Sequence, residues 1–188
     1  MKKPAWTLSA SQVIILGFAA MILAGSLLLT LPFATRDGQG APFFDALFTA
    51  VSAACVTGLV VRDTAAYWSG FGQGVLLTLI QIGGMGVVTF AVILFTAAGQ
   101  RITLRQRGIM QESISAPKLG GIVRLTGFIL TMTAFFELLG AALLAPVFCP
   151  AFGLLRGLWY SLFHSVSAFC NAGFDLMGEG APFSSLTG

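Results

Sequence analysis

Apolar residues run along most of this chain in long stretches, and the charged residues fall between them. No charged side chain occurs from Pro4 to Thr35 or from Thr64 to Gln100. A third stretch runs from Leu125 to Phe148 and is broken only by Glu137. Because an α-helix needs about 20 apolar residues to cross a bilayer, each stretch predicts a membrane-spanning helix. The apolar centres of the three predicted spans are residues 13–31, 74–98 and 125–148.

Two further apolar stretches, residues 43–55 and 158–170, are too short to span a membrane. Each is 13 residues long, and Gly58 or Gly173 follows shortly after its end. A helix of this length covers about 20 Å, which is less than the hydrocarbon core. Both stretches fall in segments that separate the predicted spans on one side of the membrane. They therefore predict short helices that enter the membrane and return without crossing it.

The two short stretches form an internal repeat with an offset of 115 residues. Between residues 47–59 and 162–174, seven of thirteen positions are identical, including the cysteine and the glycine at the end of each stretch. Such a fixed offset indicates two copies of one structural unit. The predicted fold is an all-α integral membrane protein of helix–pore loop–helix units. The first unit covers residues 1–110, a cytoplasmic linker covers 111–124, and a truncated second unit covers 125–188.

Composition supports the membrane assignment and excludes several other classes. The chain has 188 residues, of which 56% are hydrophobic and 9% are charged, and its mean hydropathy is +0.90. Soluble domains carry about 25% charged residues, and disordered chains are still more polar. The chain has three cysteines without a C-x-x-C pair and one histidine, so no zinc site or disulfide framework is expected. No basic run suits nucleic acid, and no nucleophile with a base suggests an enzyme.

The distribution of lysine and arginine predicts the orientation of the chain. Positively charged residues concentrate on the cytoplasmic side of membrane proteins. With the N-terminus inside, seven basic residues are cytoplasmic and three are outside, so we expect a cytoplasmic N-terminus in a plasma membrane. The seven are Lys2, Lys3, Arg101, Arg105, Arg107, Lys118 and Arg124, and the three are Arg36, Arg62 and Arg156. The run of apolar residues after Lys3 is longer than the apolar region of a signal peptide.

The residues after each short helix suit a cation path. A helix that ends within the membrane leaves unpaired carbonyl groups at its C-terminus, which also carries about half a negative charge. Irregular backbone at that depth occurs where it is buried or lines a water-filled path. Residues 56–59 and 171–174 are thus candidate selectivity filters, in which carbonyl oxygens replace the hydration shell of an ion. The alternative is that Gly58 and Gly173 are ordinary C-caps.

Three stretches resemble the Trk/Ktr/HKT superfamily of potassium transporters, and the Ktr-type membrane subunit in particular. They are F-F-D-A-L-F-T-A-V-S-A-A-C-V-T-G-L (Phe43 to Leu59), Q-I-G-G-M-G-V-V-T-F (Gln81 to Phe90) and H-S-V-S-A-F-C-N-A-G-F (His164 to Phe174). The resemblance implies a pore of four units with one filter glycine each, and a glycine at this place goes with potassium preference. It places the ion-coordinating carbonyl groups at Val56, Thr57, Gly58, Asn171, Ala172 and Gly173. It also implies potassium as the cargo, a homodimer, and cytosolic nucleotide-binding regulatory subunits as partners.

The predicted function is therefore potassium uptake across the plasma membrane, with two alternatives. At the offset of 115, Gly188 corresponds to Gln73, so the chain holds one unit and about two-thirds of another, and we expect it to be a fragment. One alternative is a re-entrant transporter for sodium or another cation. The other is a truncated membrane subunit that does not conduct.

Two features of the predicted spans need a separate explanation. Glu137 lies within the third span, where an acid is costly, and we expect it to be a structural carboxyl group. Replacement by glutamine should then reduce the amount of folded protein more than it changes ion selectivity. The motif Gly83-Gly84-x-Gly86 predicts either close helix packing or a bend in the second span, and the sequence leaves both open.

Overall fold

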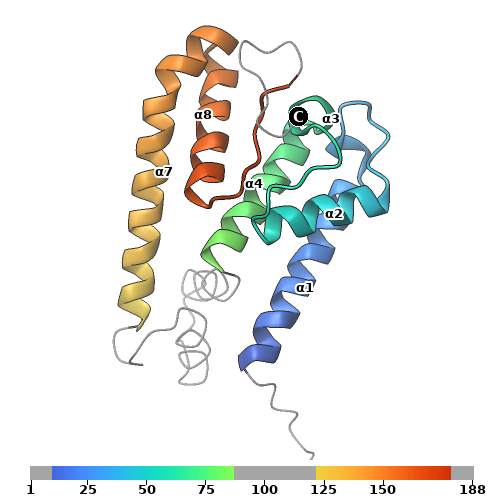
Figure 1. The fold of residues 1–188 in the computed structure, drawn as a ribbon, viewed down its shortest axis with the longest axis vertical. Coiled ribbons are helices and arrows are strands. Elements are labelled where there is room, and N and C mark those ends of the chain that lie inside the picture. The colour runs from blue at the N-terminus through green and yellow to red at the C-terminus, as the bar shows by residue number, and fades with distance from the viewer. Residues whose placement is uncertain (1–9, 87–121, 179–188) are drawn as a thin grey trace, which may run out of the picture.

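A computed structural model describes residues 10–86 and 122–178, and all the regular structure in these residues is helical (Figure 1). The helices are α1 (Ala10–Leu29), the 3-10 helix η1 (Pro32–Ala34), α2 (Phe43–Ala54), α3 (Thr64–Tyr67), α4 (Gly70–Met85), α7 (Ile122–Phe152) and α8 (Leu154–Phe169). The described residues contain no β-strand, as expected of an all-α membrane protein. The second predicted span beyond residue 86, most of the predicted linker, and the basic residues from 2 to 3 and from 101 to 118 lie outside them.

One described helix is long and apolar enough to cross a membrane. It is α7, in which Thr126–Phe152 meets both conditions. The described parts of the other two predicted spans, in α1 and α4, form shorter apolar helices, Ile14–Leu29 and Gly70–Met85. Large apolar side chains are exposed along α1 and α7, which suits a lipid environment rather than water.

Two helix boundaries differ from the sequence prediction. Helix α7 continues to Phe152, beyond the expected end at Phe148. Helix α8 begins at Leu154 rather than at residue 158. Gly157, the residue just before the predicted short helix, lies inside α8. A Cβ atom on Gly157 would lie 2.5 Å from the Cα atom of Cys149, so the glycine allows α8 to pack closely on α7.

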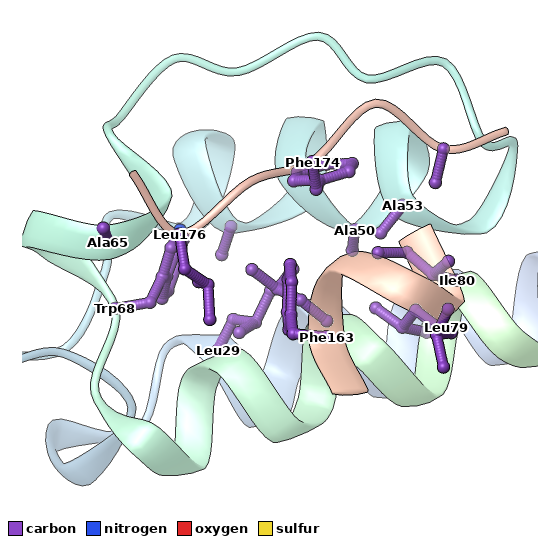
Figure 2. Packing of buried hydrophobic residues seen from close by; sticks show 14 of the residues in the cluster. Leu29, Ala50, Ala53, Ala65, Trp68, Leu79, Ile80, Phe163, Phe174 and Leu176 are labelled. Atoms are coloured by element: carbon purple, nitrogen blue, oxygen red, sulfur yellow. The ribbon is translucent and has the colours of Figure 1, made fainter. Parts of the chain in front are cut away.

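The helices pack around α4, which joins the two halves of the chain. Helices α1, α2 and α8 all contact α4, and α7 packs along α8 (Figure 1). One cluster of buried residues draws on both halves: Leu29, Ala50, Ala53 and Ile80 come from the first, and Phe163, Ala172, Phe174 and Leu176 from the second (Figure 2). Close packing of this kind holds helices together in lipid, where the hydrophobic effect is weak.

A buried hydrogen-bond network reinforces the contact between α4 and α8. The indole Nε1–H of Trp159 donates to Oε1 of Gln73 over 2.9 Å. The Nε2 atom of Gln73 in turn donates to the carbonyl oxygen of Trp68 over 3.2 Å. Gln73 is buried, so both polar ends of its amide have a partner. This network fixes α8 of the second half against α4 of the first.

Candidate functional site: the loops after α2 and α8

The first loop (residues 55–59) follows α2 and begins with a common helix-ending motif. The N–H group of Val56 donates to the carbonyl oxygen of Ala53 over 3.3 Å, and that of Thr57 donates to Ser52 over 3.0 Å. These two bonds form a Schellman motif, in which the first residue past the C-cap is left-handed. That residue is Val56, whose φ is 50°.

The second loop (residues 170–174) follows α8 and repeats this motif. The N–H group of Asn171 donates to Ala168 over 3.0 Å, and that of Ala172 donates to Ser167 over 2.7 Å. All four of these residues correspond to those of the first loop at the offset of 115. The left-handed residue is now Asn171, whose φ is 57°. The repeat in the sequence is thus a repeat in backbone geometry.

The glycines of the two loops are not the residues that end the helices. Gly58 has φ of 72° and Gly173 has φ of 75°, and each lies two residues beyond the left-handed residue of the Schellman motif. Thr57 and Ala172, which lie between, do not have positive φ. The C-cap alternative from the sequence therefore does not apply. Each loop instead alternates between positive and negative φ, and a glycine occupies the second position of positive φ at no steric cost.

The two loops meet at their glycines. A Cβ atom on Gly58 would lie 2.7 Å from the carbonyl oxygen of Ala172 and 3.1 Å from the Cα atom of Gly173. A Cβ atom on Gly173 would lie 3.3 Å from the Cα atom of Gly58. The fold thus brings Gly58 of the first loop together with Ala172 and Gly173 of the second, although Gly58 and Gly173 are 115 residues apart.

The electrostatics of the loops favour a cation. The last turns of α2 and α8 contain no basic residue that would neutralise the negative ends of the helix dipoles. Within the part of the chain that the structure describes, no cluster of three or more His, Cys, Asp or Glu side chains could hold a metal ion.

Helix α4 packs against the C-terminal ends of α2 and α8, where the two loops begin, and two glycines of α4 allow this close approach. A Cβ atom on Gly83 would collide with the carbonyl oxygen of Ala54, at the end of α2. A Cβ atom on Gly84 would lie 2.6 Å from Sγ of Cys170, at the end of α8. The helix then ends at Met85, and Gly86 follows with φ of 82°. The motif Gly83-Gly84-x-Gly86 therefore provides close packing and the C-terminal end of α4.

Glu137 is buried and has a partner on another helix. The amide Nε2 of Gln81, in α4, donates to Oε1 of Glu137 over 2.8 Å. The backbone carbonyl oxygen of Glu137 also accepts from Oγ of Ser165, in α8, over 2.6 Å. These contacts agree with a structural role for this acid. The sequence did not identify Gln81, although an amide in an apolar span is a signal for such a partner.

Comparison with known proteins assigns the chain to a family. It matches the family model TrkH, described as a cation transport protein, over residues 5–184. It is 44% identical to the potassium/sodium uptake protein NtpJ of Enterococcus hirae, over 92% of this chain and 38% of that protein. It is 43% and 34% identical to the Ktr system potassium uptake proteins B and D of Bacillus subtilis, over 88% and 92% of this chain. The chain spans 37% and 38% of the length of these two relatives. It belongs to the TrkH family of cation transport proteins.

Proposed function

We propose that this chain contributes two filter loops to the pore of a potassium uptake subunit in the plasma membrane. The observation that carries the proposal is the shared backbone of the two loops and their contact at Gly58 and Gly173. In this proposal α2 and α8 enter the membrane from the outer face and end within it. The ion then meets the carbonyl oxygens of residues 56–58 and 171–173.

The backbone of the loops supports this role through the direction of carbonyl groups. In a strand, successive residues point to opposite faces. In our proposal, the alternation between positive and negative φ over residues 56–58 and 171–173 turns successive carbonyl groups toward the same side instead. A row of such oxygens can replace the water around a potassium ion as it enters. Passage then requires no bond to be made or broken, which fits a transporter rather than an enzyme.

The proposed topology extends the repeat to whole units. Residues 1–110 form the first helix–pore loop–helix unit, and residues 125–188 begin the second, with the N-terminus in the cytoplasm. The charge distribution supports this orientation. Two loops cannot surround an ion, so we propose that further units complete the ring. The same proposal includes a dimer and cytosolic nucleotide-binding regulatory subunits, which the resemblance to Ktr-type subunits supports.

A second candidate is the uptake of sodium together with potassium. It is favoured by the relative from Enterococcus hirae, which is named a potassium/sodium uptake protein and is 44% identical to this chain. The two candidates predict different ratios of potassium to sodium uptake in the same assay.

The test is Gly58→Ser in the complete reading frame, expressed in cells that lack their own potassium uptake. A non-glycine residue in left-handed backbone costs about 1–2 kcal/mol, so we expect the preference for potassium over sodium to fall about tenfold. Gly74→Ser is the control, because Gly74 lacks positive φ and a Cβ atom there would have open space. Unchanged ion preference in a Gly58→Ser protein of normal abundance contradicts the filter.

A further inference from the structure

His164 connects α8 to the chain that follows the second loop. One ring nitrogen, Nδ1, lies 2.7 Å from the carbonyl oxygen of Tyr160 in the preceding turn of α8. The other, Nε2, lies 3.2 Å from the backbone nitrogen of Leu176. The ring also packs against Phe148 of α7, with 5.2 Å between the ring centroids. The imidazole therefore bridges α8 and the backbone of Leu176, three residues after Gly173.

The two contacts define the tautomer of the ring. A backbone N–H group can only donate, so Nε2 must accept the bond from Leu176 and carries no proton. The proton of the neutral ring is then on Nδ1, where it is donated to the carbonyl oxygen of Tyr160. Both nitrogens are satisfied in this form alone. In the other tautomer, Nε2–H would face the N–H group of Leu176, and the lone pair of Nδ1 would face the carbonyl oxygen of Tyr160.

A second side chain of α8 holds the same segment. Oγ of Ser167 donates to the carbonyl oxygen of Phe174 over 2.6 Å. His164 and Ser167 are three residues apart, so they share one face of α8. Phe174 and Leu176 are both fully buried in the cluster that joins the two halves (Figure 2). The backbone on the C-terminal side of Gly173 is thus fixed at two points.

The first half lacks these two connections. Thr49, the counterpart of His164, donates instead to the carbonyl oxygen of Asp45 in its own helix over 2.7 Å. Ser52, the counterpart of Ser167, accepts a bond from Oγ1 of Thr57 over 3.0 Å. The helix–loop motif therefore forms without a histidine. The contact that His164 adds in the second half is therefore the one with Leu176, in the segment after the second loop.

We propose that His164 is a positioning residue for ion selection, which acts by holding the backbone after Gly173 in place against the first loop. The inference rests on the proposed function, since it concerns the second loop as a filter. His164 acts through Leu176 rather than by touching the ion. Because Gly173 lies against Gly58, a displacement of the second loop changes the spacing between the two loops.

Two substitutions separate the two nitrogens of the ring. In His164→Gln, the side-chain oxygen can reach the position of Nε2 and accept from Leu176. In His164→Asn, the shorter amide can donate to Tyr160 but does not reach Leu176. We expect His164→Asn to lower the preference for potassium over sodium about fivefold, as for one lost hydrogen bond, and His164→Gln to restore most of it. Thr49→Val is the matched control in α2 and should leave the preference unchanged.

These variants are measured in the complete reading frame, with uptake of both ions normalised to the amount of protein in the membrane. Equal ion preference in wild type and His164→Asn overturns the proposal. An equal loss in both variants also overturns it, because a merely structural histidine would give that result. The Gly58→Ser variant separates the two proposals: if it changes ion preference and His164→Asn does not, the filter stands and the positioning role fails.

A spectroscopic measurement tests the proposal without any variant. The ¹⁵N chemical shifts of His164 in the labelled wild-type protein distinguish the two neutral tautomers. We expect a proton on Nδ1 and none on Nε2. A proton on Nε2 overturns the proposal, since the Leu176 N–H group would then have no acceptor on the ring.

Discussion

The two halves of the chain share one helix–loop backbone but differ in how they hold the residues that follow. In the first half, Leu59, the last residue of the first loop, and Val61 are 60% and 46% exposed. In the second half, their counterparts Phe174 and Leu176 are 2% and 1% exposed. The loops themselves have nearly the same φ angles. The loop geometry is therefore a local property of the helix end, whereas burial of the next residues depends on a neighbour.

The neighbour of the second loop is the first half of the chain. Ala172, Phe174 and Leu176 pack into the cluster that contains Trp68 and Leu29 (Figure 2). In the corresponding segment of the first half, Nε of Arg62 lies 2.9 Å from Oδ2 of Asp45 in an exposed ion pair. The residues that follow Gly173 are thus more deeply buried than those that follow Gly58. Four experiments test this difference, from the largest expected effect to the smallest.

Alanine at the two loop glycines should have the largest effects, and they should be unequal. Both positions have positive φ, but a Cβ atom on Gly58 would press on the Ala172 carbonyl oxygen at 2.7 Å, while one on Gly173 would have 3.3 Å to its nearest atom. We expect Gly58→Ala, like Gly58→Ser, to lower the preference for potassium over sodium about tenfold, and Gly173→Ala to lower it less. Uptake of both ions by cells that express each variant measures this. Equal losses of potassium preference in the two variants would show that backbone strain at positive φ decides the effect and that the contact with Ala172 does not.

Alanine at Gly83 and at Gly84 should lower the stability of the protein, and Gly83→Ala should lower it more. The Cβ atom of Gly83→Ala meets the backbone of Ala54, which cannot move without shifting α2. That of Gly84→Ala meets the side chain of Cys170. Overpacking costs about 1–3 kcal/mol, and we expect the upper end for Gly83→Ala. Thermal unfolding in detergent compares the two, and Cys170→Ala should partly rescue Gly84→Ala. A lower melting temperature for Gly84→Ala than for Gly83→Ala would contradict this order.

An exchange of the left-handed residues should have a moderate effect. Val56 has φ of 50°, which is rare for a β-branched residue, whereas asparagine adopts this conformation several times more often. We expect Val56→Asn to stabilise the protein and Asn171→Val to destabilise it, each by about 1 kcal/mol. Melting temperatures of the two variants and of the double exchange provide the measurement. If both variants change the melting temperature in the same direction, the backbone strain at Val56 is already relieved by the residues around it.

Removal of the surface ion pair should have the smallest effect. The side chains of Arg62 and Asp45 are 50% and 25% exposed, and solvent-exposed ion pairs contribute little to stability. We expect Arg62→Ala to leave the melting temperature and the preference for potassium within experimental error. A clear loss of selectivity in Arg62→Ala would show that the first loop depends on this contact as much as the second depends on His164.

Much of the architecture could be predicted from the sequence, because it depends on properties that are local along the chain. The apolar run that ends at Phe148 predicted the long helix α7. The 13-residue run from Phe43 predicted α2 nearly to the residue, since Pro42 and the Schellman motif limit it. The offset of 115 predicted that the two loops are related, and their backbone angles agree with this.

The contacts of the candidate site could not be predicted in the same way. The sequence singled out Gly58 and Gly173 but gave no sign that they touch. It identified Glu137 without Gln81, which is 56 residues away. It gave no sign that both ring nitrogens of His164 contact backbone groups. Each of these pairs depends on which helices become neighbours.

The sequence by itself therefore determined the apolar helices and the repeat of the short helix with its loop. Helix length and backbone preference depend on side chains within a few positions of one another, so a pattern along the chain records them. The tertiary structure alone decided that α4 packs behind both loops and that the second loop is buried against the first half. Those contacts depend on the close approach of distant segments, which Gly83, Gly84 and Gln73 permit but do not specify.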